Sequence, residues 1–194
     1  AALGQRDFAR LWSYAGLYNY GTLLLAMGLG LLSSWALVLL LFGARTILIL
    51  LGAMSLALLR QQAASTEFDR VSGLANRLPW TVGGLLAGGM GLIGFPLTAG
   101  FASQWTLLQQ VAVRDGRWLW VMAPAAVGVG IGFLRGLAAL GGSTANPQVR
   151  REPLAAGWLV AIAVLVSALL GIAPQLLTGP VSAALTALAT LVGR

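Results

Sequence analysis

Residues 35–59 read WALVLLLFGARTILILLGAMSLALL, and Arg45 is the one charged side chain in this run. A helix needs about 20 mostly apolar residues to cross the hydrocarbon core of a bilayer, so the run predicts a transmembrane helix. The whole chain of 194 residues is 58% hydrophobic and 9% charged. Soluble domains carry about 25% charged residues. The sequence therefore predicts a membrane protein, with the lipid bilayer as its immediate environment.

Comparable apolar runs lie on both sides of this stretch and alternate with short charged segments. Four of them are further candidates for spans: Leu11–Leu32, Pro79–Val113, Trp118–Leu140 and Leu154–Ala173. The tail Val181–Val192 is apolar but short, which predicts an interfacial helix, with a sixth span as the alternative. The predicted fold class is all-α, a polytopic transmembrane helical bundle of about five spans plus an apolar C-terminal helix. Residues 1–194 are expected to form a single transmembrane domain with no soluble domain.

Arginine is unevenly distributed between the two sides that this layout defines. Cytoplasmic loops of membrane proteins carry an excess of basic residues. One side would hold seven arginines, Arg6, Arg10, Arg60, Arg70, Arg77, Arg150 and Arg151, against three on the other, Arg114, Arg117 and Arg194. The first side is therefore predicted to face the cytoplasm. The bias also persists if residues 79–113 form two complete spans.

The inventory of reactive side chains excludes several classes of site. All 12 basic residues are arginine, because the chain has no Lys, and it also has no His and no Cys. Nucleophile and base pairs built on Cys or His, metal sites built on them, and a Lys Schiff base are therefore excluded. The five carboxylates lie in short polar stretches. We expect no catalytic site, cofactor or metal site in this chain, and the scattered arginines do not favour nucleic acid.

A helix break is predicted inside the third apolar run, where residues 94–105 read GFPLTAGFASQW. Pro96 lacks an N–H and is flanked by Gly94 and Gly100, so we interpret the run as one discontinuous span. Within lipid, such a break is tolerated only where it is buried in protein or lines a polar cavity. Transporters place ion sites at breaks of this kind. The alternative is a surface turn between two helices.

Polar side chains near the break are candidates for an ion path. Ser103 and Gln104 follow the break by one to two helical turns, where they would point at its freed backbone groups. Tyr18 and Asn19 lie on a polar face of the first run, which either lines a water path or makes hydrogen bonds between helices. Arg45 requires a partner or water, because burying its charge costs at least about 2.5 kcal/mol on insertion scales. It is either an ion-path charge or a structural residue paired with backbone carbonyls, with Gln104 or with a carboxylate of another subunit.

Glycine spacing indicates how the helices meet. Gly84 and Gly88 are four residues apart, and Gly128, Gly132 and Gly136 continue the same spacing along the fourth run. Small residues at this interval let two membrane helices approach closely. We expect tight packing at both places, and this pattern by itself identifies no function.

Several of these residues together resemble a known family, the antiporter-like membrane subunits of respiratory complex I, Mrp cation/proton antiporters and membrane hydrogenases. The family stretches are matched in order along nearly the whole chain by three groups of residues: Asp7, Arg10, Tyr14 and Gly21; then Gly73, Leu74 and Pro79; then Gly94, Pro96, Gly100 and Phe101. Near the end, Gly171-Ile172-Ala173-Pro174 looks like the family's final-helix ending. The resemblance implies the C-terminal part of a subunit of roughly fourteen helices, from just before the tenth helix and including the broken twelfth.

Departures from the family pattern concern the residues that titrate. The family's Lys, His and Lys or Glu positions correspond here to Ala9, Asn19 and Gln104. A side-chain proton relay needs groups whose pKa can be moved by burial and neighbours, and Arg and Gln are not such groups. We therefore expect this half of the subunit to lack the side-chain relay, although a water path past Gln104 and Ser103 is compatible with the sequence.

The resemblance implies a membrane subunit of a proton- or cation-translocating assembly, either complex I or Mrp-like. Its partners would be other membrane subunits, and its location a bacterial inner membrane. The alternatives are a small membrane scaffold without transport, and a channel or transporter for another ion.

Overall fold

The computed structural model describes residues 2–29, 35–142 and 152–173, with side chains described from residue 42 onward in the second helix. Within these ranges the regular elements are all helices, joined by turns and loops, and one isolated antiparallel bridge links Asp7 and Glu67. The predicted all-α class is thus confirmed. The apolar tail expected at residues 181–192 lies outside the described residues.

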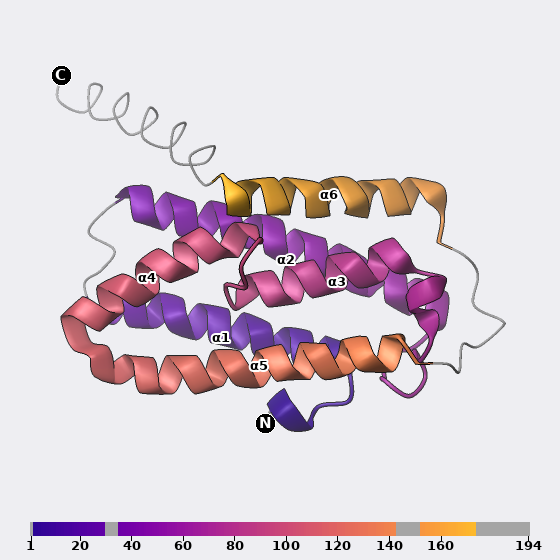
Figure 1. Ribbon diagram of the computed structural model, residues 1–194, viewed down its shortest axis with the longest axis horizontal. Coiled ribbons are helices and arrows are strands. Elements are labelled where there is room, and N and C mark those ends of the chain that lie inside the picture. Colours follow the sequence, from indigo (N-terminus) through magenta and orange to yellow (C-terminus); the bar gives the residue numbers. More distant parts are fainter. Residues whose placement is uncertain (1, 30–34, 143–151, 174–194) are drawn as a thin grey trace, which may run out of the picture.

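In the described part of the chain, six α-helices form the bundle (Figure 1), and they closely follow the apolar runs. Their bounds are α1 Phe8–Gly28, α2 Trp35–Ala63, α3 Pro79–Leu92, α4 Ala99–Asp115, α5 Leu119–Leu140 and α6 Leu154–Ile172. The first helix begins three residues earlier than the run at Leu11 suggests, because Asp7 caps it. Pro79 stands in the first turn of α3, where its missing N–H has no helical partner to lose.

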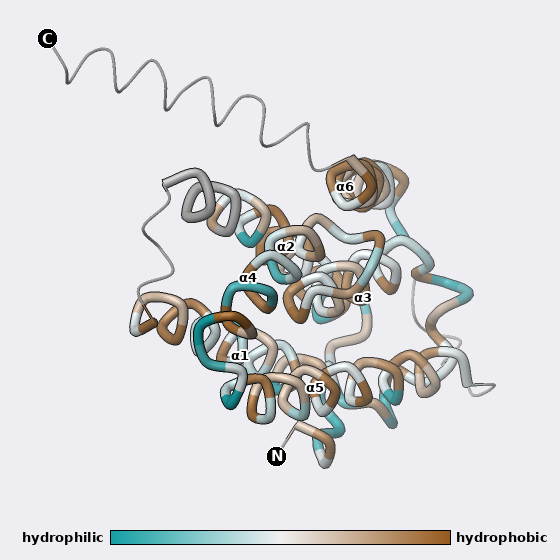
Figure 2. The backbone as a smooth tube through the Cα atoms, turned by 60° about the vertical axis from the view of Figure 1, so that its left-hand side comes forward, coloured by the Kyte–Doolittle hydropathy of each residue, from teal (hydrophilic) through white to brown (hydrophobic). Residues whose placement is uncertain are grey.

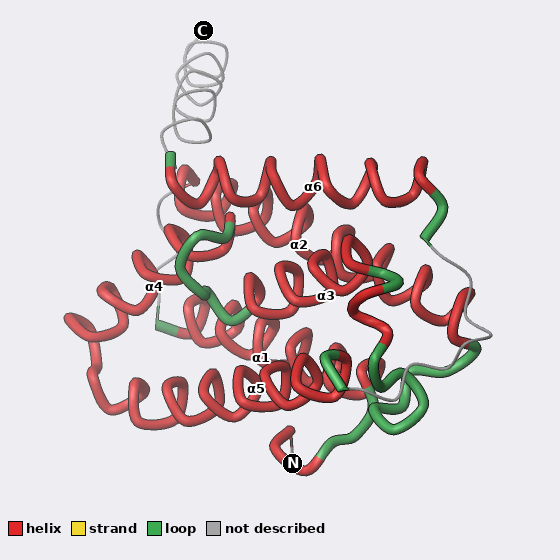
Figure 3. Tube along the Cα trace, turned by 45° about the vertical axis from the view of Figure 1, so that its right-hand side comes forward, coloured by secondary structure: helices red, strands yellow, loops and turns green. Residues whose placement is uncertain are grey.

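The predicted discontinuous span is present as α3 and α4, which run in the same direction with an irregular loop between them (Figures 1 and 3). Helix α3 packs on α2 and α6 and also contacts α1 and α5, which places it in the middle of the bundle (Figure 2). The break at its end is buried on one side only, because Thr98 and Ala99 are buried whereas Phe95 and Leu97 are 48% and 65% exposed. The buried residues fit a break within the bundle, and the exposed ones fit the alternative of a surface turn.

Length and composition alone identify three stretches that could cross a membrane within the described residues: Phe42–Ala63, Ala99–Leu140 and Leu154–Ile172. The second combines α4 and α5 across a short turn at Gly116–Trp118. Helix α3 has only 14 residues. Helix α1 carries Tyr14, Tyr18 and Asn19, which lower its hydropathy.

Glycines allow the close helix packing that their spacing predicts. A Cβ on Gly88 would lie 2.8 Å from the Cα of Gly52, so α3 and α2 meet backbone to backbone. On α5, a Cβ on Gly132 would lie 2.5 Å from Leu11, and one on Gly136 would lie 2.5 Å from the ring of Phe8. The α5 glycines thus make room for the buried apolar side chains of α1.

Candidate functional site

The helix break has a backbone shape that needs a glycine. Helix α3 ends at Leu92, α4 begins at Ala99, and Gly94 has φ +81°, in the left-handed region that favours glycine. A Cβ on Gly94 would also lie 2.5 Å from Cγ of Gln104. Leu97 has φ +70°. Gly94 thus allows the turn and brings it against the Gln104 side chain.

Asn19 satisfies a carbonyl that the break leaves free. In a continuous helix the carbonyl of Leu92 would accept from the residue four positions on, which is Pro96 and has no N–H. Instead, Nδ2 of Asn19 donates to this carbonyl at 3.2 Å, and Asn19 is buried. The α1 side chain therefore replaces the hydrogen bond that the proline removes.

The start of α4 is held by two hydroxyl groups. Ser167, in the middle of α6, accepts a hydrogen bond from the N–H of Ala99 at 3.2 Å. Thr98 donates to the carbonyl of Phe95 at 2.6 Å. Gly171 also packs closely here, because a Cβ on it would lie 2.6 Å from the Thr98 carbonyl. Helix α6 thus fixes the second half of the broken span.

Ser103 does not act on the break as expected. Its hydroxyl donates to the carbonyl of Gly100, in the first turn of its own helix, at 3.0 Å. Gly100 itself is in close contact with α3, since a Cβ on it would lie 2.1 Å from the Gly91 carbonyl oxygen. The residue three positions back is within reach of a serine hydroxyl in a helix, so Ser103 satisfies its hydrogen bond locally.

Five polar residues from three helices meet beside the break. Nε2 of Gln104 donates to the Tyr18 hydroxyl at 3.0 Å, and Nη2 of Arg45 donates to Oγ1 of Thr22 at 3.1 Å. Tyr18 and Thr22 are four residues apart on α1 and so share a face of that helix, which brings both pairs together. Thr22 in turn donates to the Asn19 carbonyl at 2.8 Å. We call Tyr18, Asn19, Thr22, Arg45 and Gln104 the break cluster.

The charge of the break cluster comes from Arg45 alone. Arg45 is only 7% exposed, and Gln104 only 4%. The predicted pairing of Arg45 with Gln104 or with backbone carbonyls is not observed, because its hydrogen-bond partner is the Thr22 hydroxyl. Arginine keeps its proton, and amide and threonine side chains exchange none near neutral pH. The cluster thus combines a fixed positive charge with neutral hydrogen-bonding groups.

The family-motif positions at the start of the chain lie outside this cluster, except that Gly21 adjoins it. Asp7 caps α1 by accepting from the N–H of Arg10 at 3.0 Å, and it accepts from the Thr66 hydroxyl at 2.8 Å. Arg10 is exposed, and Tyr14 is partly buried. Gly21 lines a cavity of about 250 Å³ with Tyr18 and others. The first motif residue therefore has a structural role at the helix start.

The Asp7 carboxyl is held in its charged form. Its partial burial raises the pKa, but hydrogen bonds from the N–H of Arg10 and from the Thr66 hydroxyl outweigh this effect, and the pKa is lowered from its ordinary value of 3.8. Backbone bonds from Phe8 to Thr66 and from Phe68 to Arg6 run alongside. The carboxylate thus joins the start of α1 to the loop after α2.

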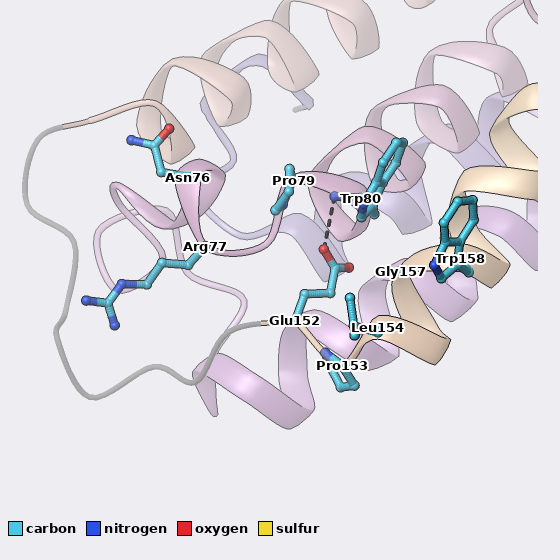
Figure 4. Close-up of a pocket in the computed structure, with 9 residues that line it drawn as sticks. All are labelled: Asn76, Arg77, Pro79, Trp80, Glu152, Pro153, Leu154, Gly157 and Trp158. Carbon is cyan, nitrogen blue, oxygen red and sulfur yellow. Dashed lines mark hydrogen bonds between the residues drawn. The ribbon is translucent and has the colours of Figure 1, made fainter.

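Glu152 is a structural residue that the sequence did not reveal. Its carboxylate accepts from the N–H of Trp80 at 3.1 Å (Figure 4). It also accepts from the N–H of Thr81 at 2.8 Å and from the Thr81 hydroxyl. Glu152, two residues before the start of α6, therefore caps the first turn of α3, where a negative charge is favourable. Ser167 was likewise not predicted, although it is the one hydroxyl in the α6 sequence.

Comparison with known proteins agrees with the resemblance. Residues 1–132 match the family model described as NADH:quinone oxidoreductase/Mrp antiporter, TM. The chain is 32% identical over 192 residues, which is 92% of its length, to a protein named NADH-quinone oxidoreductase subunit N 1 from Symbiobacterium thermophilum. It is 31% identical over 131 residues, or 62% of its length, to NADH-quinone oxidoreductase subunit N from Desulforudis audaxviator.

These matches cover only part of the relatives. The chain aligns with 38% of the Symbiobacterium protein and with 24% of the Desulforudis protein. The family model includes α1 to α4 and most of α5, so it spans the break and every residue of the break cluster. The chain is an integral membrane protein that belongs to the NADH:quinone oxidoreductase/Mrp antiporter family of transmembrane subunits.

Proposed function

We propose that the chain serves in a membrane subunit of a proton- or cation-translocating assembly of the complex I or Mrp type, located in a bacterial inner membrane. Family membership and the bacterial relatives named as oxidoreductase subunits support this proposal. The chain has no Cys or His. Any electron transfer on iron–sulfur clusters held by cysteine would therefore take place outside these 194 residues.

We further propose that this part of the subunit contributes no side-chain proton relay. The supporting observation is that Asn19 and Gln104, at two family relay positions, lie in the buried break cluster beside a fixed arginine charge. Asn19 has a structural task there, since it holds the end of α3. The third position, Ala9, precedes Asn19 by ten residues, or about 15 Å along a helix, so it lies away from the cluster.

A water path past Gln104 is not supported by the contacts of its side chain. Its stem packs on Gly94, and its amide is engaged with Tyr18. The nearby charge of Arg45 also raises the energy of any excess proton in this region, because like charges repel strongly where the dielectric constant is low. The break cluster is thus suited to holding the broken helix and opposing cation passage.

Purification from native membranes tests the subunit role. A tag on this chain, with extraction in a mild detergent, is expected to recover other membrane subunits and quinone-dependent or antiport activity. Recovery of the chain alone would contradict the proposal and favour the scaffold alternative. Ionic current carried by the purified chain in a planar bilayer would instead favour the channel alternative.

A further inference from the structure

Helix α3 has one side that its neighbours leave open. Helices α5 and α6 both contact α3 but do not pack closely on each other (Figure 1). Between α3 and α5 lies a cavity of about 310 Å³, bordered by Met90 and Ile93 on one wall and by Val127 and Ile131 on the other. Val127 is 58% exposed and Ile131 is 40% exposed. We call this cavity, with Phe95 at its end, the break groove.

The helix break forms the end of the break groove. Pro96 borders the cavity, and both Pro96 and Leu97 are exposed. Ile131 lies level with the break, because a Cβ on its neighbour Gly130 would lie 3.2 Å from Cδ1 of Ile93. In the described part of the chain, the carbonyls of Pro96 and Leu97 accept no hydrogen bond. The open side of the break therefore presents backbone groups that lack a donor.

The break lies at the depth of the lipid tails. Helix α3 has 14 residues, so the break is about 21 Å from the α3 start, where Trp80 is 51% exposed. Helix α4 has 17 residues, so the break is about 25 Å from the turn that contains the exposed Trp118. Exposed tryptophan is enriched at the two membrane surfaces. A hydrocarbon core about 30 Å thick would thus enclose the break.

Lipid alone cannot satisfy the open side of the break. Lipid tails offer no hydrogen-bond donor, so irregular backbone at this depth must be covered by protein or must line water. An ordered water needs two to four polar partners. The walls of the break groove instead carry the apolar side chains of Met90, Ile93, Val127 and Ile131. A further helix therefore fits better than water, because its apolar side chains would pack on these walls while one polar side chain reaches the free carbonyls.

The relatives indicate a source for such a helix. The chain aligns with 38% of the Symbiobacterium protein, so most of that relative lies outside the aligned part. A helix of the same polypeptide also docks more readily than one from a separate subunit, because its tether gives it a high effective concentration.

We propose that the break groove binds a membrane helix of the same subunit, from residues outside these 194, with an O–H or N–H side chain that donates to the Pro96 or Leu97 carbonyl. Docking at this groove follows from the exposed break and from family membership. It is independent of whether the assembly translocates protons, so its failure would leave the proposed function in place.

Photocrosslinking in the complete subunit tests the docking. Ile131 is replaced by p-benzoylphenylalanine in the native assembly, the membranes are irradiated, and the joined peptides are identified by mass spectrometry. We expect position 131 to be joined to an apolar peptide of the same polypeptide, from outside these 194 residues. Ile162 is a matched control, because it is 54% exposed and lies on the opposite side of α6 from the buried Val160. The same replacement there should give no crosslink to that peptide.

Crosslinks from position 131 to phospholipid alone would overturn the proposal. Crosslinks only to a second copy of this chain or to a different subunit would also overturn it, as would the same joined peptide at position 162. If the Ile131 variant does not assemble, the same replacement of Val127, on the same wall of the groove, decides the matter. A joined helix without an O–H or N–H side chain within one turn of the contact would contradict the hydrogen bond to the break.

Discussion

At Asn19, one amide replaces the hydrogen bond that Pro96 takes away from the end of α3. A sequence reading recognises Asn19 as a departure from a family His, but it does not show which group the amide contacts. The contact joins residues 73 positions apart, and it depends on how α1 packs on α3. The structure therefore shows that Asn19 holds the end of α3, whereas the sequence showed only that the family's His is absent at this position.

Substitution of Asn19 measures how much its contact with the Leu92 carbonyl stabilises the fold. We expect Asn19→Leu to leave the Leu92 carbonyl buried without a donor and to lower the free energy of unfolding by about 1–3 kcal/mol. Equilibrium unfolding in detergent would measure the loss. Ser13→Ala is a control on the exposed face of the same helix, where the hydroxyl bonds only to its own helix. Equal stability of Asn19→Leu and Ser13→Ala would contradict the role of Asn19.

Asp7 should make the stability of the chain depend on pH. Because its pKa is lowered in the folded chain, its carboxylate stabilises the fold above the ordinary value of 3.8, and this contribution is lost as pH falls through the folded value. Asp7→Asn should therefore be less stable than wild type near neutral pH, and the two should converge in acid. Unfolding midpoints measured between about pH 7 and pH 2.5 would show this. A constant difference over that range would contradict it.

At the scale of elements, the position of the break was predictable, but the contacts that hold it were not. Pro96, with Gly94 and Gly100 beside it, interrupts an apolar run, and this local chemistry is visible in the sequence. The bond from Ala99 to Ser167 joins α4 to α6, and the Glu152 cap joins the α6 start to α3. Such contacts depend on the arrangement of helices, which apolar runs alone do not specify.

Gly88 tests the close contact between α3 and α2. We expect Gly88→Ala to separate the two helices and to destabilise the bundle by about 1–3 kcal/mol, because its Cβ would meet the Gly52 backbone at 2.8 Å. Gly83→Ala, on the same helix, would meet nothing within 4 Å. It should be neutral or slightly stabilising, since alanine is the better helix former. Equilibrium unfolding in detergent would measure the stability of both variants. An equal change in stability for Gly88→Ala and Gly83→Ala would contradict the close packing.

At the scale of the whole molecule, the arginine bias predicts which loops share a side of the membrane. The loop after α2 and the turn between α4 and α5 lie at opposite ends of the bundle (Figure 1). The first contains Asp69 and the second contains Gly116. The chain contains no Cys, so single cysteines can be introduced directly. In intact cells, we expect an impermeant maleimide to label Gly116→Cys and not Asp69→Cys. The opposite labelling would reverse the orientation.

The amino-acid composition of the whole chain also bears on its function. The absence of Lys and His affects the whole chain, but its consequence is concentrated where Asn19 and Gln104 stand in a cluster with one fixed charge. Family membership follows from most of the chain length. The lack of a side-chain proton relay, by contrast, depends on a few residues at the break.

Proton flux through the reconstituted assembly, with wild-type chain or with Gln104→Leu, tests this claim most directly. Leucine keeps much of the side-chain volume but can neither hydrogen-bond to Tyr18 nor order water. With subunit content checked in both samples, the absence of a relay predicts fluxes within about twofold of each other across pH 6–8. A loss of roughly tenfold or more in an intact assembly would show that protons pass through the break cluster, and would contradict the claim.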